Sequence, residues 1–384
     1  MAEPYTGQVT VLNYCRRDAA LTQMRRVIVI VGCVLSTGAL WADTKNPASP
    51  ASTLKEKHRG VCFVAGPGRP ADAAFDRLAA LNVNWISQTP FGWQQSAGSP
   101  EVVLATSGRI WWGESDEGLA DAARRARNLG IRTILKPHVW IRDRSDGRWR
   151  GNIDFSTPEE WDRWWASYRH LILHYAELAE SAGMEALCIG TELRSAVLNR
   201  PDAWRRLIAD VRAVYGGELT YSANWYREFE EVPFWDALDY IGLQVYFPLA
   251  DSAAAALTLD DLKAAWAPHV KLIEAMQQRV GKPVLFTEVG YRSTADAAVE
   301  PWIWRSAAPV DLELQAACYE AMFRTFWRKP WFAGTHVWKW FPEGSTQFGG
   351  RRARRHALQR ERGFTPQGKP AEEVLARWYR AGAE

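Results

Sequence analysis

Two apolar runs of the chain each end in a glutamate: ALCIGTE at residues 186–192 and PVLFTE at residues 283–288. Short apolar runs of this kind are typical of buried strands, and the packing of a buried strand gives no reason for it to end in a carboxylate. Side chains alternate between the two faces of a strand. We therefore predict that Glu192 and Glu288 each share a face with the residues two and four positions before them, and that both point to the inside of one parallel sheet.

The alternation of strand-like and helix-like patterns continues in both directions from these two runs. Eight strands are predicted after residue 58, at Gly60–Ala65, Val83–Gln88, Thr133–His138, Ala186–Glu192, Leu219–Asn224, Tyr240–Tyr246, Pro283–Glu288 and Gly334–Trp338. Helices are predicted at about 71–81, 117–129, 158–182, 202–215, 259–280, 311–328 and 370–381, with only a short helix within 226–237. Eight strand–helix repeats fit a closed barrel better than an open sheet. The sequence therefore predicts an α/β protein with a single (β/α)8 TIM barrel over residues 58–384.

The longest predicted helix has a clear start signal. Thr157, Pro158 and Glu160 supply an N-cap, a proline in the first turn and the third residue of a capping box. Aromatic side chains recur behind this cap at helical spacing, beginning with Trp161, and we interpret them as packing against the barrel wall.

Residues 1–57 are interpreted as a signal peptide and a polar linker. A short basic segment at Met24 precedes an apolar run at 27–34 and then small residues, as in secretory signal peptides, which makes Met24 a candidate for the true start. Residues 43–57 are polar and rich in Pro and Ser, as linkers are. We expect a secreted or periplasmic protein, with membrane attachment only through this leader; lipid anchoring at Cys33 is the less favoured alternative.

Composition disfavours several classes of function. Lys and Arg number 47 and Asp and Glu 44, so the net charge of +3 gives no reason to expect nucleic acid as a partner. The GPG turn at 66–68 lacks the GxGxxG spacing of a dinucleotide site, and the five cysteines show no metal-ligand spacing. We therefore expect buried free thiols, no metal, no cofactor and a monomer. The arginine-rich run at 351–362 is interpreted as a solvated loop, with contact to a polyanion or a membrane surface as the less favoured alternative.

Polar and aromatic residues follow several predicted strands and are expected to converge on one barrel mouth, because active sites of such barrels lie at the carboxyl ends of the strands. The residues that we select as substrate-binding are Lys136, His138, Trp140, Asn224, Tyr246, Trp338 and Trp340. The chain also holds 21 Trp, and flat indole rings can stack on sugar rings. Trp111, Trp112, Trp302 and Trp304 lie in the predicted loops and are further candidates for such contacts.

A pair of carboxylates at one site is what the cleavage of a glycosidic bond needs. One acid protonates the leaving oxygen, and one ionised carboxylate attacks the sugar or activates water. We expect Glu192 to hold the proton and Glu288 to stay ionised, with the hydroxyl of Tyr246 as a hydrogen-bond donor.

The chain resembles glycoside hydrolase family 113, in the clan of glycosidases whose catalytic glutamates follow strands four and seven. The segments that carry the resemblance are LKPHVW (135–140), WRG (149–151), IGTELR (189–194), LTYSANW (219–225), LDYIGLQVYFPL (238–249), LFTEVGYRS (285–293), HVWKW (336–340) and GKPAEEVL (368–375). The resemblance implies a retaining endo-β-1,4-mannanase, with Glu192 as acid/base and Glu288 as nucleophile. It also implies sugar contacts for His138, Tyr246 and Trp338, which match positions that the clan commonly fills with these residue types.

The sequence departs from the clan at two positions that bear on sugar recognition. Thr191 stands where many members have Asn before the acid/base, and no Arg ends strand two; Asn224 and Lys136 are expected to take over part of that polar work. The predicted substrate is a β-1,4-linked mannan or manno-oligosaccharide. The alternatives are a β-glucanase or exo-glycosidase of the same mechanism, or a non-catalytic sugar-binding envelope protein.

Overall fold

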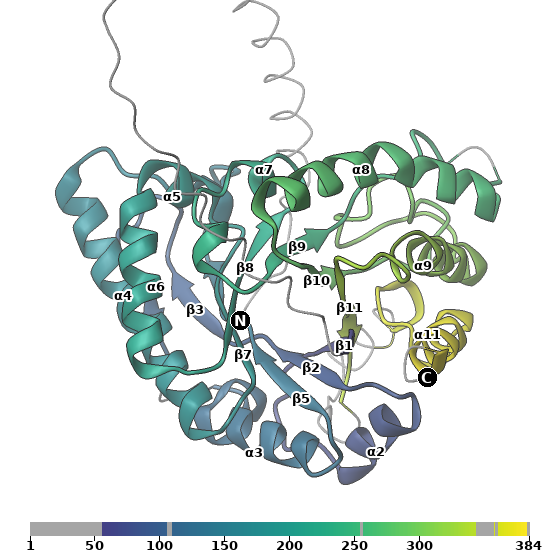
Figure 1. Cartoon of the computed structure of the whole chain (residues 1–384), viewed down its shortest axis with the longest axis horizontal. Helices are drawn as coiled ribbons and strands as arrows, with labels where there is room; N and C mark the ends of the chain where they lie inside the picture. Colours follow the sequence, from purple (N-terminus) through teal and green to yellow (C-terminus); the bar gives the residue numbers. More distant parts are fainter. Residues whose placement is uncertain (1–55, 106–109, 254–255, 343–356, 358–359, 382–384) are drawn as a thin grey trace, which may run out of the picture. The chain divides into compact units, whose positions relative to one another are not determined.

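The computed structural model describes residues 56–105, 110–253, 256–342, 357 and 360–381. Its centre is a closed barrel of parallel strands in the order β1-β11-β10-β9-β8-β7-β5-β2 (Figure 1). These strands are β1 (His58–Phe63), β2 (Trp85–Gln88), β5 (Arg132–Leu135), β7 (Ala186–Thr191), β8 (Glu218–Asn224), β9 (Ile241–Val245), β10 (Val284–Val289) and β11 (Phe332–Trp340). The (β/α)8 barrel predicted from the sequence is confirmed.

The helices lie around the strands (Figure 1). They are α2 (Asp72–Ala80), α3 (Asp116–Arg127), α4 (Pro158–Ser181), α5 (Arg194–Asn199), α6 (Pro201–Val214), α7 (Glu228–Glu231), α8 (Leu259–Val280), α9 (Leu312–Phe326) and α11 (Pro370–Ala381). In the part of the chain that the structure describes, the connections also hold the 3-10 turns η2 (Trp112–Glu114), η3 (Arg150–Asn152) and η4 (Trp235–Ala237). Every helix predicted from periodicity is present within a few residues, and α5 is an additional helix that was not predicted.

The predicted third strand, Thr133–His138, is divided in the structure. β5 ends at Leu135, and a separate strand, β6 (His138–Ile141), begins after Lys136 and Pro137. Proline has no N–H to donate to a strand ladder, so the barrel strand ends there. β6 pairs instead with β3 (Phe91–Gln94), and β3 with β4 (Val103–Leu104), in a small sheet beyond the barrel.

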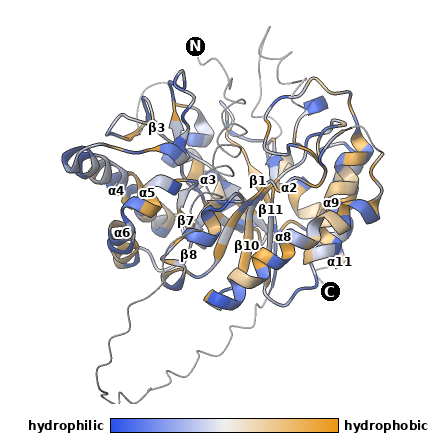
Figure 2. Cartoon of the chain, turned by 90° about the horizontal axis from the view of Figure 1, so that it is seen from above, coloured by the Kyte–Doolittle hydropathy of each residue, from blue (hydrophilic) through white to orange (hydrophobic). Residues whose placement is uncertain are grey.

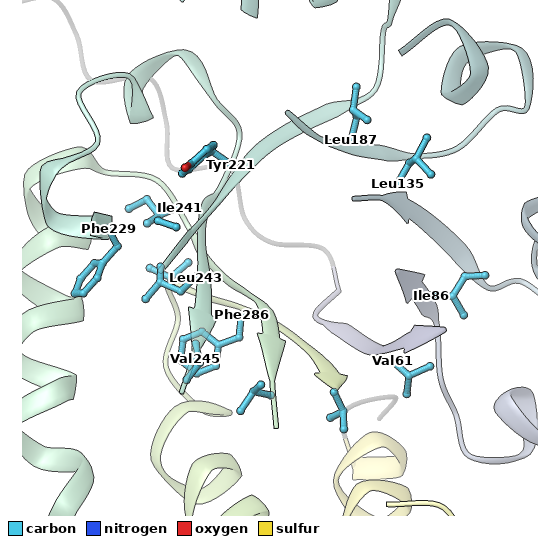
Figure 3. Close-up of a cluster of buried hydrophobic side chains, with 14 of the residues drawn as sticks. Val61, Ile86, Leu135, Leu187, Tyr221, Phe229, Ile241, Leu243, Val245 and Phe286 are labelled. Carbon is cyan, nitrogen blue, oxygen red and sulfur yellow. The ribbon is translucent and has the colours of Figure 1, made fainter. Parts of the chain in front are cut away.

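Apolar side chains on the strands form the core between the barrel and its helices. Figure 3 shows this layer on neighbouring strands, including Val61, Ile86, Leu135, Leu187 and Phe286. In Figure 2, hydrophobic residues follow the central strands, and hydrophilic residues are frequent on the surrounding helices. A smaller cluster of Trp85, Ile134, Ala186 and Cys188 comes from the alternate positions of β2, β5 and β7, and so lies inside the barrel.

The predicted alternation along the two glutamate strands is wrong. A side chain at Gly190 would meet Trp204 and Tyr168 of the outer helices, and the ring of Phe286 lies 4.8 Å from that of Phe326 on α9. Both positions therefore face the helices. The register shifts between Cys188 and Thr191 and between Phe286 and Glu288. Such bulges re-aim the following side chains, which brings both glutamates to the mouth despite the mistaken parity.

The start of α4 agrees with the sequence. The Thr157 hydroxyl accepts the N–H of Glu160 at 3.2 Å, and the Glu160 carboxylate accepts the N–H of Thr157 at 3.1 Å. This reciprocal pair is the predicted capping box, and Trp161 is buried in the core.

Other expectations concern cysteines, membrane segments and the termini. Cys62, Cys188 and Cys318 are buried free thiols, as expected. In the described residues, no helix is long and apolar enough to cross a membrane. The predicted signal peptide, the start at Met24, lipid attachment at Cys33 and nearly all of the linker lie outside the described residues.

Most of the arginine-rich run at 351–362 also lies outside the described residues. At its end, Arg362 donates to the carbonyl oxygens of Ser306 and Ala308. This end of the run is therefore bonded to the preceding loop instead of being only solvated.

Candidate active site

Glu288 lies at the end of β10 and is bonded by three side chains from other strands. The Lys136 amine is 2.8 Å from Oε2, and the Gln244 amide nitrogen donates to the same oxygen at 3.2 Å. The Tyr246 hydroxyl donates to Oε1. Glu288 is 6 % exposed and Lys136 is fully buried, so this ion pair is formed largely away from solvent.

The groups around Glu288 have shifted proton affinities. Burial alone would lower the pKa of the Lys136 amine, but the charge and hydrogen bond of Glu288 outweigh it and raise that pKa above its usual value. Burial, the charge of Glu288 and its hydrogen bond, and to a smaller extent the charge of Glu192, raise the pKa of Tyr246 well above the ordinary value for a phenol. Lysine therefore stays charged and tyrosine stays a hydroxyl donor, and both bond the carboxyl group of Glu288.

Glu192 follows β7 and is held by different partners. The guanidinium of Arg150 contacts Oε2 at 2.6 and 3.1 Å, and the Asn224 amide nitrogen donates to Oε1 at 2.7 Å. Its backbone has φ of 54°, in the left-handed region that few non-glycine residues adopt. Its N–H donates to the carbonyl of Ser222 on β8 at 2.9 Å.

Strand register brings the two carboxylates to the same end of the barrel. Asn224 on β8 is level with Gln244 on β9, and Gln244 is level with Glu288 on β10. Asn224 bonds Glu192, and Gln244 bonds Glu288. The convergence predicted from the ends of the fourth and seventh strands is therefore present.

Two of the other predicted contact residues, His138 and Trp338, lie near Lys136. His138 is buried near Arg150 and Lys136; burial and those two charges lower the pKa of its imidazole well below the usual value. Its Nε2 has no hydrogen-bond partner in the described residues. Trp338 is partly exposed. The amine of Lys136 lies 6.0 Å from the centroid of the Trp338 ring.

Trp140 and Trp340 differ in accessibility. Trp140 is partly exposed and packs at 6.1 Å from Trp93 in the small sheet. Trp340 is only 1 % exposed, and the guanidinium of Arg77 on α2 lies 5.5 Å from its ring centroid. Trp340, which was selected from the sequence as a substrate-binding residue, therefore faces the helices instead of the barrel mouth.

Aromatic residues of the loops border the site. Trp302 stacks on Trp225, the residue that follows Asn224, with 5.1 Å between the ring centroids. Trp304 lies 6.1 Å from Trp338. Trp111 is 41 % exposed. Trp302 and Trp304, two of the four predicted loop tryptophans, thus pack against residues next to the site.

Lys339 is a feature of the mouth that sequence reasoning missed. Its amine lies 4.2 Å from the ring centroid of Trp304, 4.9 Å from that of Phe341 and 5.6 Å from that of Trp338. Burial lowers its pKa to about 7, although the charge of Glu288 opposes this shift. The segment HVWKW gives no sign of this, because strand parity places position 339 on the opposite face from Trp338.

Arg150 was also missed. It stands in the WRG segment of η3, in a loop where arginine is usually solvated, and nothing local indicates its partner 42 residues away. The sequence has no arginine at the end of the second strand, but Arg150 places a guanidinium group beside Glu192.

No group of His, Cys, Asp and Glu side chains that could hold a metal is found in the described part of the chain. The chemical groups that the mouth does present are two carboxylates with different neighbours, hydrogen-bond donors and aromatic faces. A (β/α)8 barrel with this arrangement at the carboxyl ends of its strands has the fold and the groups expected of a glycoside hydrolase.

Comparisons with known proteins specify the family. The model of Glycoside Hydrolase Family 113 matches residues 67–369, so the chain belongs to that family. It is similar to the GH113 β-mannanase of Alicyclobacillus acidocaldarius solved with ManMIm, with 31% identity, a TM-score of 0.71 and coverage of 86% of this chain and 100% of the other.

Two further comparisons define the extent of the similarity. A GH113 β-1,4-mannanase complex shows 28% identity, a TM-score of 0.70, and coverage of 85% and 99%. The endo-1,4-β-D-mannanase of Thermotoga petrophila, at 13% identity, a TM-score of 0.55 and coverage of 85% and 99%, is similar in fold alone. No curated protein sequence matches the chain.

Proposed function

We propose that this enzyme cleaves β-1,4-linked mannan or manno-oligosaccharides with retention of anomeric configuration. The observation that carries the proposal is the unequal bonding of the two glutamates. Glu288 is bonded to a buried lysine, a tyrosine hydroxyl and an amide N–H, and these three donors support its proposed role as the nucleophile. Glu192 lies on a neighbouring part of the same mouth, where it serves as the acid and then the base.

The reaction proceeds in two steps. Glu288 attacks the anomeric carbon while Glu192 protonates the departing glycosidic oxygen, which leaves a glycosyl ester on Glu288. Glu192 then removes a proton from water, which attacks the same carbon and releases Glu288. Arg150 contacts Glu192 Oε2, so a bound sugar must displace the guanidinium if that oxygen is to donate the proton.

Several residues are positioned to contact the sugar. The unpartnered Nε2 of His138 can bond a hydroxyl group, and Trp338 offers a partly exposed ring beside Lys136. The Asn224 amide carries a second N–H besides the one given to Glu192 and can donate it to a sugar hydroxyl. Thr191 points elsewhere, with its hydroxyl 3.4 Å from the carbonyl of Pro137. The mannanases of the family support mannose as the sugar.

The proposal is tested with aryl β-mannosides and manno-oligosaccharides, using wild type, Glu192→Ala and Glu288→Ala. Glu288→Ala should abolish turnover of every substrate. Glu192→Ala should lose roughly 10²–10⁴-fold on oligosaccharides but much less in the first step with a 2,4-dinitrophenyl leaving group, which needs no acid. Glu230→Ala, an exposed glutamate, is the matched control.

The same experiment distinguishes the alternatives. NMR of the first-formed product should show the β anomer, and an α product would refute retention. Faster hydrolysis of the matching β-glucans would reassign the sugar. Binding of manno-oligosaccharides without turnover by the wild type would indicate a sugar-binding protein in place of an enzyme.

We also propose that the enzyme is exported through the leader within residues 1–57. The basic, apolar and small-residue order of that segment supports the proposal. N-terminal sequencing of the protein from culture medium, periplasm and membrane fractions tests it. Retention of the intact leader in the cytoplasm would contradict export.

A further inference from the structure

A third carboxylate, Glu228, is buried beside the Glu192 side of the mouth. It lies on α7, four residues after Asn224, and is 0 % exposed. Its Oε1 accepts the Tyr221 hydroxyl at 2.5 Å, and its Oε2 accepts the backbone N–H of Asn224 at 2.7 Å. The catalytic steps described above make no use of this group, and a carboxyl group is seldom buried so completely unless it is paired.

Both hydrogen bonds of Glu228 lead to Glu192. By one route, the Tyr221 hydroxyl also accepts the N–H of Leu193 at 2.6 Å, and Leu193 directly follows Glu192. By the other, Asn224 donates its side-chain N–H to Glu192 Oε1 at 2.7 Å. The side-chain oxygen of Asn224, Oδ1, accepts the backbone N–H of Tyr226 at 2.8 Å. This bond orients the side-chain amide so that its nitrogen faces Glu192.

The backbone at Glu192 needs such support. Its φ of 54° is sparsely populated for residues with a side chain, and surrounding contacts must hold it. The N–H of Leu193 is buried behind it and would lose its partner without the Tyr221 hydroxyl. Tyr221 is fully buried and packs at 5.3 Å from Trp204, so the hydroxyl has little freedom to move.

The charge environment of Glu228 also involves Glu192. Burial raises the pKa of Glu228 to about 8; its hydrogen bonds from Tyr221 and Asn224 oppose the shift, and the charge of Glu192 adds to it. The two carboxyl groups are therefore close enough to interact while belonging to different elements.

We propose that Glu228 is a positioning residue, which acts through Tyr221 and Asn224 to aim the carboxyl group of Glu192 at the departing glycosidic oxygen. The proposal rests on the acid/base role given to Glu192 above. If Glu228 no longer holds the carboxyl group of Glu192 in position, protonation of the leaving group becomes weaker, but the attack by Glu288 is unaffected.

The test compares Tyr221→Phe, Glu228→Gln and the double variant over a series of aryl β-mannosides with leaving groups of increasing pKa. Tyr221→Phe keeps the ring and removes the bridging hydroxyl. Glu228→Gln replaces one acceptor oxygen by a donor, so one of the two donors loses its acceptor. Glu230→Gln, an exposed neighbour on α7, is the control.

We expect kcat/KM of both single variants to fall about tenfold for the poorest leaving groups and less than about twofold for 2,4-dinitrophenyl mannoside, since general acid catalysis matters only where the leaving group needs a proton. The double variant should be no worse than the worse single variant, because both changes interrupt one network. Thermal melting and titration of active sites correct each rate for folded, competent enzyme.

Two outcomes overturn the inference. An equal loss across the series would show that Glu228 and Tyr221 only support the fold, and an unchanged series would show that they do not act on Glu192. Glu192→Ala is measured on the same substrates. If that variant is also insensitive to the leaving group, the proposed function fails; if it is sensitive and the other variants are not, only the positioning role fails.

Discussion

At the scale of single residues, the two glutamates of the mouth differ by what surrounds them and not by what they are. Glu288 is bonded by a buried lysine, a tyrosine hydroxyl and an amide, whereas Glu192 is bonded by a guanidinium and an amide. The tyrosine hydroxyl is the donor that Glu288 has and Glu192 lacks, and the separate tasks proposed above require a bound sugar to displace Arg150 from Glu192.

Lys339 is a buried amine whose charge costs stability. It is 8 % exposed among three aromatic rings, and burial lowers its pKa from 10.5 to about 7. The buried charge costs stability below pH 7. Between pH 7 and 10.5 the folded protein has lost the Lys339 proton, whereas the unfolded chain still holds it. The free energy of unfolding therefore rises with pH over this interval, and the cost disappears above it.

We expect Lys339→Met to raise the free energy of unfolding by roughly 0.5–2 kcal/mol. The gain should be larger at pH 6 than at pH 9, because only the charged amine is costly to bury. Urea unfolding at the two pH values measures this, and Lys271→Met, an exposed lysine, is the control. A loss of stability at pH 6 would show that the aromatic rings compensate fully for desolvation of the amine.

At the scale of elements, bulges and prolines decide where functional side chains point. Pro137 ends β5 and leaves Lys136 and His138 at the mouth. The register shifts in β7 and β10 bring the side chains of Glu192 and Glu288 to the mouth. Simple alternation from Gly190 and Phe286, which face the helices, would have pointed both glutamates away from it. Periodicity was therefore sufficient to predict the barrel strands and most of the helices, but not α5, the small sheet of β3, β4 and β6, or the direction of each side chain.

The cap of α4 offers a prediction at this scale. Thr157→Ala removes the hydroxyl that accepts the Glu160 N–H and should lower the free energy of unfolding by about 1 kcal/mol. Because Thr157 is not among the residues that bond the two glutamates, kcat/KM at 25 °C should not change. Chemical denaturation and initial rates are the measurements, with Ser156→Ala as the control. A change in kcat/KM without a loss of stability would contradict this separation.

The sequence predicted different parts of the site unequally. Glu192 and Glu288 could be found because a carboxylate is unexpected after an apolar strand. Glu228 could not, because EFEE reads as an exposed acidic turn although its first glutamate is fully buried. Arg150 and Lys339 depend on distant partners that only the fold brings together.

At the scale of the whole molecule, the barrel closes where β1 pairs with β11, and a buried histidine pair lies at that seam. His58 Nδ1 is 3.1 Å from His336 Nε2, and the His58 ring stacks on Trp85 at 3.9 Å. Burial, with nearby positive charge, lowers the pKa of His336 to about 3 and that of His58 well below its usual value.

This seam predicts sensitivity to acid. Above pH 6.5 both histidines are neutral in the folded and unfolded chain; below it only the unfolded chain takes up protons, down to the low folded pKa values. The free energy of unfolding should therefore fall by about 1 kcal/mol or more per pH unit below 6.5. Urea unfolding between pH 7.5 and 5, with hydrogen exchange in β1 and β11, tests this. A flat profile over that range would be inconsistent with a neutral buried pair.

The claim on which the mechanism depends is that Glu288 forms a covalent bond to the sugar. It is tested by treating the enzyme with a 2-deoxy-2-fluoro-β-mannosyl fluoride, which slows the second step, and then mapping the protein by peptide mass spectrometry. We predict inactivation with one fluoromannosyl group on the peptide that contains Glu288, and none in Glu288→Ala. Turnover of this reagent with no adduct, or an adduct on another carboxylate, would contradict it.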